Sequence, residues 1–261
     1  MGVVNVTPDS FSDGGETSDP DRAVATARRL LAEGAAIVDI GGESTRPGAA
    51  AVPLAEELRR VLPVLEGLSG LPVSIDTSKA EVARRALDLG AMLVNDVTAL
   101  RTDSALAGVI ADAGAYVCLM HMQGEPRTMQ AEPRYEDVVG EVAGFLEERL
   151  AAAVAAGIPE EHVCLDPGVG FGKTPDQNLE LVRGLERICS IGRPVLVGLS
   201  RKSTLARVLG DPDGRVGSAA ASIGAAVAAF DRGATIFRAH DVACHVEALT
   251  VAAAIERGRL A

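Results

Sequence analysis

Short apolar segments alternate with longer amphipathic segments along the whole chain. The apolar segments hold four to six residues each, in continuous runs rather than at alternate positions. Such runs are typical of strands that are buried on both faces of a parallel sheet. We therefore predict eight strands, at Val3–Val6, Ala36–Ile40, Pro72–Ile75, Ala91–Asn95, Tyr116–Met120, His162–Asp166, Pro194–Leu199 and Thr235–Arg238.

The longer segments are rich in Ala, Leu, Arg and Glu and have helical spacing, as at Asp21–Glu33, Leu54–Leu68, Lys79–Leu89, Tyr135–Ala156 and Ser218–Asp231. Helix-like runs are followed by a glycine, as at a helix C-terminus, at Gly34, Gly90, Gly114, Gly157 and Gly233. Pro20 and Pro175 suit the first turn of a helix. These signals predict helices between the strands.

Eight strands that alternate with helices over about 250 residues predict an α/β fold, a (β/α)8 TIM barrel. A doubly wound open sheet is the alternative. No linker, low-complexity tract or change of composition divides the chain. We therefore expect one domain over residues 1–261.

Composition narrows the functions that this fold serves. With 36 acidic and 25 basic residues, the chain lacks the basic character of a general nucleic-acid binder. No uncharged run reaches the ~18 residues of a membrane span, and no charged-then-apolar leader opens the chain. The four cysteines show no CxxC pair, so we interpret them as reduced core thiols. We expect a cytoplasmic protein that binds neither nucleic acid nor membranes.

Polar side chains gather where the predicted strands end. In such barrels the chemistry lies at the carboxyl ends of the strands, in the βα loops. Those positions hold Asn5, Asp39, Glu43–Arg46, Asp76, Asn95, Met120-His121, Asp166, Ser200–Lys202, Arg238 and His240. One residue of this kind is more often a turn or cap residue than a ligand. Because so many converge on one barrel mouth, the pattern predicts a site.

The residue types in this set suit two kinds of group. Asp76, Asn95 and Asp166 suit a flat heterocycle, since a carboxylate accepts two parallel N–H bonds from a 2-amino, N3–H edge. The cations Arg46, Lys202 and Arg238, with His240, suit a phosphoryl group, and the Asn5 oxygen suits Mg²⁺.

A glycine-rich segment, the histidines and two long loops also bear on function. GVGFGKT (168–174) resembles a phosphate loop, but Pro167 stands where the first glycine belongs, so we interpret it as a flexible loop beside the site. His162 and His245 are interpreted as fold residues, and His121 is left open. The long, Gly/Ser/Pro-rich loops Thr7–Ser18 and Gly41–Pro53 are predicted to be mobile lids.

Eight motifs in order resemble the dihydropteroate synthase family over nearly the whole chain: NVTPDSFSDGG (5–15), DIGGESTRPGA (39–49), SIDTSK (74–79), NDV (95–97), LMHMQG (119–124), LDPGVGFGK (165–173), GLSRKS (198–203) and RAHDV (238–242). The resemblance implies a barrel transferase of folate biosynthesis that uses Mg²⁺. It would join p-aminobenzoate to (7,8-dihydropterin-6-yl)methyl diphosphate, giving 7,8-dihydropteroate and pyrophosphate. It also leads us to expect residues ahead of the first strand.

The resemblance also implies the roles of single residues. The pterin would be held by Asp76, Asn95, Asp166, Lys202, Met120 and Phe171. The diphosphate would be held by Thr45, Arg46, Arg238 and His240, with Asn5 at the metal. Phe11, Pro47, Ser200 and Arg201 would line the p-aminobenzoate pocket. We expect a homodimer, since barrels of this kind commonly dimerise and the Ala-rich last helices can pack closely.

Two other functions share part of this pattern. A pterin-binding methyltransferase would keep the Asp/Asn set without needing Arg238, His240 or the STRPG segment, and all three are present here. A catalytically inactive pterin-binding scaffold would lack an acid or the lysine of the set, and none is missing. Release of pyrophosphate with and without p-aminobenzoate would discriminate them.

Overall fold

The computed structural model describes residues 1–7, 20–44, 49–125, 128–214 and 216–259. All eight predicted strands are present, and each overlaps its predicted range. β7 and β8 are shorter than predicted, and Pro194 has no N–H with which to extend a ladder. The strands are β1 (Gly2–Asn5), β2 (Val38–Gly41), β3 (Val73–Asp76), β4 (Leu93–Asp96), β5 (Tyr116–Met120), β6 (Val163–Asp166), β7 (Leu196–Val197) and β8 (Ile236–Phe237).

Helices follow every strand, and the five glycines predicted to end helices all have positive φ. Strict alternation fails at two places, because β6 is followed by two α-helices and β7 by two. The helices are α1 (Pro20–Ala32), α2 (Leu54–Gly67), α3 (Ala80–Asp88), α4 (Leu106–Ala113), α5 (Val138–Ala155), the 3-10 turn η2 (Glu160–His162), α6 (Pro175–Arg183), α7 (Leu185–Cys189), α8 (Ser203–Val208), α9 (Ala219–Phe230) and α10 (Val242–Arg257).

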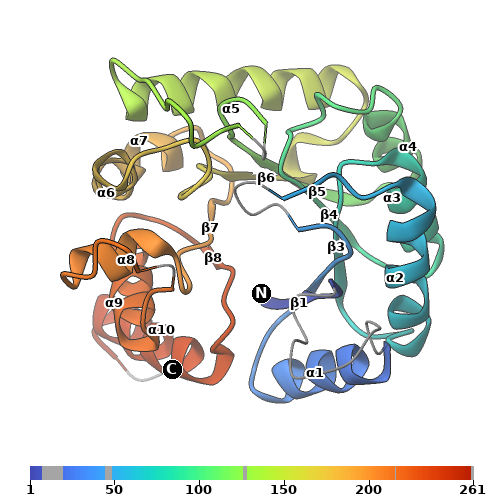
Figure 1. The fold of residues 1–261 in the computed structure, drawn as a ribbon, viewed down its shortest axis with the longest axis horizontal. Coiled ribbons are helices and arrows are strands. Elements are labelled where there is room, and N and C mark those ends of the chain that lie inside the picture. The colour runs from blue at the N-terminus through green and yellow to red at the C-terminus, as the bar shows by residue number, and fades with distance from the viewer. Residues whose placement is uncertain (8–19, 45–48, 126–127, 215, 260–261) are drawn as a thin grey trace.

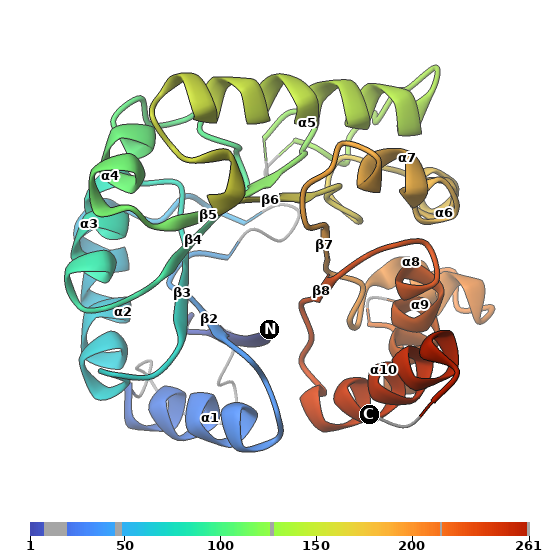
Figure 2. The same cartoon turned by 180° about the vertical axis from the view of Figure 1, so that it is seen from behind.

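The strands follow one another around a ring that lies inside the helices (Figure 1). β1 to β6 form one parallel sheet in chain order, and β7 pairs with β8. Single parallel bridges, Leu165–Val195 and Gly2–Ala239, join the two sheets on both sides. The Ala239 N–H donates to the Met1 carbonyl at 2.9 Å. β1 is therefore a neighbour of β8, as the barrel prediction requires, and Figure 2 shows the same ring from behind.

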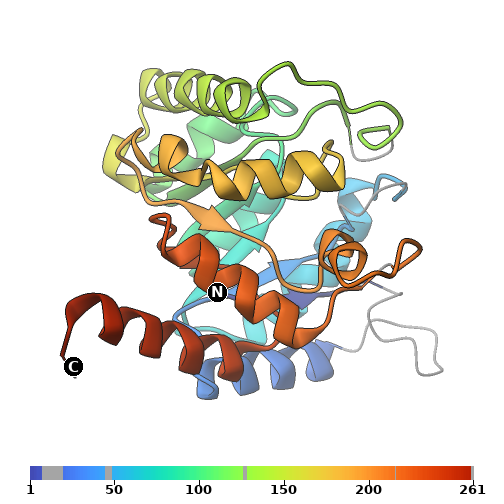
Figure 3. The same ribbon diagram turned by 90° about the vertical axis from the view of Figure 1, so that its left-hand side faces the viewer.

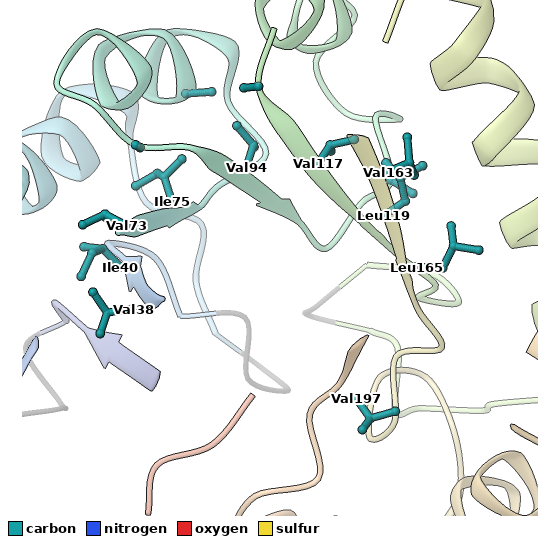
Figure 4. Close-up of a cluster of buried hydrophobic side chains, with 14 of the residues drawn as sticks. Val38, Ile40, Val73, Ile75, Val94, Val117, Leu119, Val163, Leu165 and Val197 are labelled. Carbon is teal, nitrogen blue, oxygen red and sulfur yellow. The ribbon is translucent and has the colours of Figure 1, made fainter. Parts of the chain in front are cut away.

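The main hydrophobic core lies between the strands and the surrounding helices. Because side chains alternate across a strand, every second residue points toward the helices. Leu30 of α1, Val64 of α2 and Leu146 of α5 pack into this layer. Figure 4 shows its strand residues Val38, Ile40, Val73, Ile75, Val94, Val117, Leu119, Val163, Leu165 and Val197.

The inner faces of the strands have a different character. Asp39 and Ser74, and Asp76 and Asn95, are paired in register on neighbouring strands, and all four residues are buried. Burial on both faces is thus confirmed for these strands. The expectation of continuous apolar runs is wrong for β2, β3 and β6, where apolar outward positions alternate with Asp, Ser, Gly or Cys on the inner face.

The cysteine prediction is only partly right. Cys118 and Cys164 are buried with Leu196 in a small cluster. Cys189 is half-buried, and Cys244 on α10 is exposed, so Cys244 is not a core thiol. All four are free thiols.

The side view in Figure 3 places α8 near one end of the barrel and the C-terminal end of α10 near the other. Within the described residues, no helix combines the length and apolar character needed to cross a membrane.

Candidate active site

Asp39 lies at the centre of a buried polar cluster inside the barrel. Its Oδ2 accepts a hydrogen bond from Arg238 Nε at 2.7 Å and from Asn95 Nδ2 at 3.1 Å. Arg238 Nη2 donates to Asp76 Oδ2 at 3.0 Å. Oδ1 of Asp39 is buried and has no hydrogen-bond partner among the described residues. Residues in or next to four strands thus bring together one cation, two carboxylates and an amide.

Arg238 connects residues that the sequence assigned to different subsites. It was expected at the diphosphate, and Asp76 and Asn95 at the pterin. The structure places Arg238 in direct contact with Asp76, so the two predicted subsites share an ion pair. Asp39 received no role from the sequence; its signal was an aspartate inside a strand, at a position that faces the barrel interior.

Burial sets the charge balance of this cluster. Burial, and after it the charge of Asp39, raises the pKa of Asp76 to about 8, although Arg238 opposes the shift. Burial also works against the charge of Arg238, but Asp39 and Asp76 outweigh it and the net pKa of Arg238 is raised. The cluster therefore keeps a permanent cation beside a carboxyl group that can hold its proton near neutral pH.

Asp166, at the end of β6, is buried and its Oδ1 accepts from the Gly168 N–H at 2.7 Å. Burial raises its pKa to about 6, against the effects of the Gly168 hydrogen bond, Lys202 and Lys173. A carboxylate forced to ionise in a buried position binds an N–H edge strongly, because it has few other partners.

An apolar wall stands beside Asp166. Lys202 Nζ lies 4.3 Å from the centre of the Phe171 ring, in a cation–π contact. Phe171 packs against a cluster of the buried residues Val97, Met120, Met122 and Met129. The predicted pterin residues Met120, Phe171 and Lys202 are thus brought together. Val97, Met122 and Met129 were missed, since isolated apolar residues in loops give no periodic signal.

Ser200 contacts His240. The Ser200 hydroxyl accepts from the backbone N–H of His240 at 3.2 Å, and its oxygen lies 3.1 Å from Nδ1 of the His240 ring. A hydroxyl that accepts from the backbone can still donate its own proton to Nδ1, and this arrangement would place the ring proton on Nε2. Burial, then Arg238, lowers the pKa of His240 to about 4, so the ring is neutral at pH 7. Ser200 therefore lies with the predicted diphosphate residues.

Arg201 lies at the rim. Its guanidinium donates to both oxygens of Asp241, from Nε at 3.0 Å and from Nη2 at 2.6 Å. Its backbone has φ +59°, unusual for a residue with a side chain, and its N–H donates to Ser222 Oγ at 2.9 Å. Its side chain is 47% exposed, in contrast to the buried Ser200 that precedes it in the chain.

Asn5 lies at the end of β1 beside this cluster. A Cβ added at Gly41 would meet Asp76 Oδ2 at 3.7 Å and Asn5 Oδ1 at 3.8 Å, so both oxygens border one small space. Asp76 in turn holds Arg238. In the parts of the chain that the structure describes, no three His, Cys, Asp or Glu side chains form a metal-binding group.

The second predicted lid, Gly41–Pro53, is tied down at its described ends. Glu43 accepts from Val52 N at 3.0 Å and pairs with Lys79, which also pairs with the buried Glu57. Residues 45–48 of this loop, which include Thr45, Arg46 and Pro47, and residues 8–19, which include Phe11, lie outside the described residues. The lid hypothesis and these four site assignments stay predictions.

The three histidines outside the cluster also have defined contacts. His162 stacks on Tyr116, with ring centres 4.4 Å apart, and the buried His245 lies 2.7 Å from the Asp241 carbonyl oxygen through Nδ1. Both contacts fit fold residues. His121, left open by the sequence, lies 2.9 Å from the amine of the buried Lys173.

Comparison with known proteins gives the relationship. The family described as pterin binding enzyme matches residues 1–240. The chain is 47% identical to the dihydropteroate synthase of Haemophilus influenzae, over 96% of this chain and 91% of that one. It is 46% identical to that of Escherichia coli K12, over 96% and 89%.

The chain belongs to the dihydropteroate synthase family. Among solved structures, Xanthomonas albilineans dihydropteroate synthase with 4-aminobenzoic acid has a TM-score of 0.89 and 50% identity, covering 98% of this chain and 92% of that one. The same organism's dihydropteroate synthase in complex with 7,8-dihydropteroate has a TM-score of 0.85 and 46% identity, covering 98% and 92%. Similarity at this level confirms the barrel fold and removes the doubly wound alternative.

Proposed function

We propose that this chain condenses p-aminobenzoate with (7,8-dihydropterin-6-yl)methyl diphosphate to give 7,8-dihydropteroate and pyrophosphate. Its family makes it a transferase of folate biosynthesis. The observation that carries the proposal is the buried set Asp76, Asn95 and Asp166, with the cations Arg238 and Lys202 beside it. Related structures that hold 4-aminobenzoic acid and 7,8-dihydropteroate support the substrate pair.

Asp166, Asp76 and Asn95 would hold the pterin edge. Ionised Asp166 would accept the 2-amino and N3–H protons, and Asn95 would offer its remaining amide groups. Phe171, Met120 and Lys202 would bound one face of the ring. Asp39 would hold Asn95 and Arg238 in place, because one of its oxygens accepts from both.

Arg238 and His240 would hold the diphosphate. Arg238 offers a permanent charge, and neutral His240 would donate from Nε2 without adding charge that must be desolvated. Thr45 and Arg46 complete the proposed set from outside the described residues.

Mg²⁺ fits this arrangement as an ion carried largely by the substrate. Mg²⁺ usually keeps several waters and is bound by one or two protein oxygens together with phosphates. Asn5 would supply a neutral oxygen, and the diphosphate would supply the charged ones. When bound, the ion would neutralise charge on the leaving group.

Arg201 at the rim would meet the carboxylate of p-aminobenzoate, with Phe11 and Pro47 completing that pocket. To do so, its guanidinium would leave or share Asp241, an exposed pair that costs little to open.

The reaction needs no nucleophilic side chain. The C–O bond between the methylene and the diphosphate breaks, a C–N bond to the aromatic amine forms, and the amine releases a proton. The diphosphate leaves with the electron pair of the C–O bond, and the electron-rich dihydropterin stabilises the positive charge that develops on its methylene. The protein supplies fixed orientation and charge at the leaving group, which is positional and electrostatic catalysis.

The proposal extends to assembly and location. We propose a homodimer formed through the α9 and α10 region, where Val246, Val251 and Ile255 of α10 are exposed. We also propose a cytoplasmic location. The free thiols of Cys118 and Cys164, which are paired in register on β5 and β6, support it, since such thiols are typical of a reducing compartment.

The test is pyrophosphate release from the pterin diphosphate, measured with and without p-aminobenzoate, with the product identified by mass spectrometry. We expect release that depends on p-aminobenzoate and matches dihydropteroate in amount. Pterin binding without release would indicate a scaffold, and methyl transfer from a methylated pterin would indicate a methyltransferase. Either result would reject the proposed reaction.

A further inference from the structure

Lys173 is a buried cation for which the proposed reaction has no use. It is only 2% exposed, and it ends the segment GVGFGK that resembles a phosphate loop. Its Nζ donates to the carbonyls of Gly168 and Phe171, each at 3.0 Å, and lies 2.9 Å from Nδ1 of His121. Three acceptors around one ammonium match its three protons. The amine thus faces its own loop and not a phosphate.

The 168–172 loop, which precedes Lys173, is held by several hydrogen bonds, contrary to its interpretation as a flexible loop. Gly170 N donates to Asn178 Oδ1 at 2.7 Å, and the carbonyl of Gly172 accepts from Tyr135 at 2.9 Å. Gly168 has φ +66°, and a Cβ there would lie 1.9 Å from the His121 carbonyl oxygen. No other residue type fits at this position without moving the backbone.

The loop joins Lys173 to the pterin residues through two short paths. In the first, the N–H of Gly168 donates to Asp166 and the carbonyl of Gly168 accepts from Lys173, so one residue lies between carboxylate and ammonium. In the second, Lys173 holds the carbonyl of Phe171, whose ring contacts Lys202.

We infer that Lys173 is a positioning residue of the pterin site, which fixes the 168–172 loop and supplies positive charge that keeps Asp166 ionised. It does not touch the substrate. The inference rests on the proposed function, because it takes Asp166 as the pterin-binding carboxylate. A compact ammonium suits the space better than a guanidinium, and only three of the 25 basic residues of the chain are lysines.

The charges around the pair agree with this role. Burial lowers the pKa of Lys173 to about 7, whereas Asp166 raises it. Burial, then Lys173, lowers the pKa of His121 to about 3, so the imidazole stays neutral and can accept. Within the described residues, the charged or titratable groups that face Asp166 or Lys173 include Lys202, Arg238, His121, Tyr135 and Cys118.

The experiment measures the affinity of 6-hydroxymethyl-7,8-dihydropterin from pH 5 to 8, by calorimetry, for the full chain and for Lys173→Met. Affinity in the wild type should fall as Asp166 gains a proton. In Lys173→Met the midpoint of this fall should move upward by about one pH unit, since a nearby positive charge is lost. Below the midpoint, Lys173→Met should bind the pterin about tenfold more weakly than the wild type. The part of this difference that depends on the charge of Asp166 should become smaller toward pH 8.

Two further variants separate this effect from a general loss of structure. His121→Phe keeps the aromatic packing against Phe145 but removes one acceptor of Lys173, so it should move the midpoint in the same direction by less. Arg183→Met removes a cation from α6 whose side chain is 77% exposed, and should behave as the wild type.

A double mutant completes the test. In an Asp166→Asn background, the replacement of Lys173 by Met should no longer move a midpoint near pH 6, because the carboxyl that titrates there is gone. The inference is overturned if folded Lys173→Met keeps the wild-type midpoint, or if the pH-dependent shift persists with Asn at position 166. If Lys173→Met does not fold, an unchanged midpoint in His121→Phe overturns it. A wild type that neither binds the pterin nor releases pyrophosphate would instead reject the proposed function.

Discussion

The same strands build two very different regions, one on each face. Outward from β3, Val73 and Ile75 enter an apolar layer against the helices. Inward from the same strand, Ser74 and Asp76 face a polar interior where Asp76 contacts Arg238. Both faces are equally buried, so burial does not distinguish them.

The two regions differ in what makes them stable. The outer layer is stabilised by the removal of apolar surface from water, and this stabilisation tolerates the exchange of one apolar side chain for another of similar volume. In the inner cluster each charge is costly unless a specific partner lies within hydrogen-bond distance. The outer layer therefore determines the fold. The inner cluster holds the desolvated charged groups that a pterin and a diphosphate would contact.

Removing the one cation of the inner cluster should have the largest effect. Arg238→Met leaves Asp39 and Asp76 buried without their partner, and should lower the free energy of unfolding at pH 8 by about 3–5 kcal/mol. Because Asp76 contacts Arg238, affinity for both pterin and diphosphate should fall, and not for the diphosphate alone. Urea denaturation and titration with each ligand measure these effects.

The pH dependence of that loss has a definite sign. The pKa of Asp76 is raised to about 8 in the fold, so its proton is held more tightly there than in the unfolded chain. Its contribution to stability is full below its unfolded pKa and is lost as pH rises toward 8. Arg238→Met should thus be less damaging at pH 5. Arg187→Met, which removes an exposed pair with Glu147, should change stability by less than about 1 kcal/mol at either pH.

A cavity in the outer layer should lower stability without altering the site. Ile75→Ala, next to Asp76 on β3, removes a fully buried side chain and should cost about 2–5 kcal/mol of unfolding free energy. Pterin affinity of the folded protein, measured by titration at low temperature, should stay close to wild type. A parallel drop in affinity would show that the two faces of the strand are coupled.

The contrast explains how far the sequence could predict the molecule. Outward residues such as Val94 and Leu165 lie in apolar segments, and those segments were enough to locate all eight strands. Asp76, Asn95 and Asp166 were also singled out, because they stand where apolar segments stop, and the structure buries all three. Asp39 was listed at a strand end without a role, and Lys173 was placed only in a flexible loop, since the contacts of both involve residues distant in sequence. No spacing rule reports which carbonyl a buried lysine will reach.

Asp166→Asn should separate binding from stability within the inner region. Asn keeps an oxygen for the Gly168 N–H, but loses the charge that would accept two N–H groups of the pterin. Pterin affinity should weaken by about 2–4 kcal/mol. Stability should hold or rise near pH 8, because burial raises the pKa of this carboxyl and disfavours its charge. Near-normal affinity in this variant would reject the assignment of Asp166 to the pterin.

At the rim, Arg201 offers the smallest change in stability and a clear test of its proposed role. Its left-handed backbone costs about 1 kcal/mol with a side chain and almost nothing with glycine. Its ion pair with Asp241 is half exposed on the arginine side and contributes at most about 1 kcal/mol.

Arg201→Gly loses the pair but gains the relaxed backbone, so its unfolding free energy should stay within about 1 kcal/mol of wild type. Arg201→Gln loses the pair and keeps the strain, so it should be the less stable of the two. Both should raise the KM for p-aminobenzoate to a similar extent while leaving pterin affinity unchanged, because only the rim guanidinium is lost. A variant pair that differs in stability as expected, yet saturates with p-aminobenzoate like wild type, would leave the strained arginine without a role in binding that substrate.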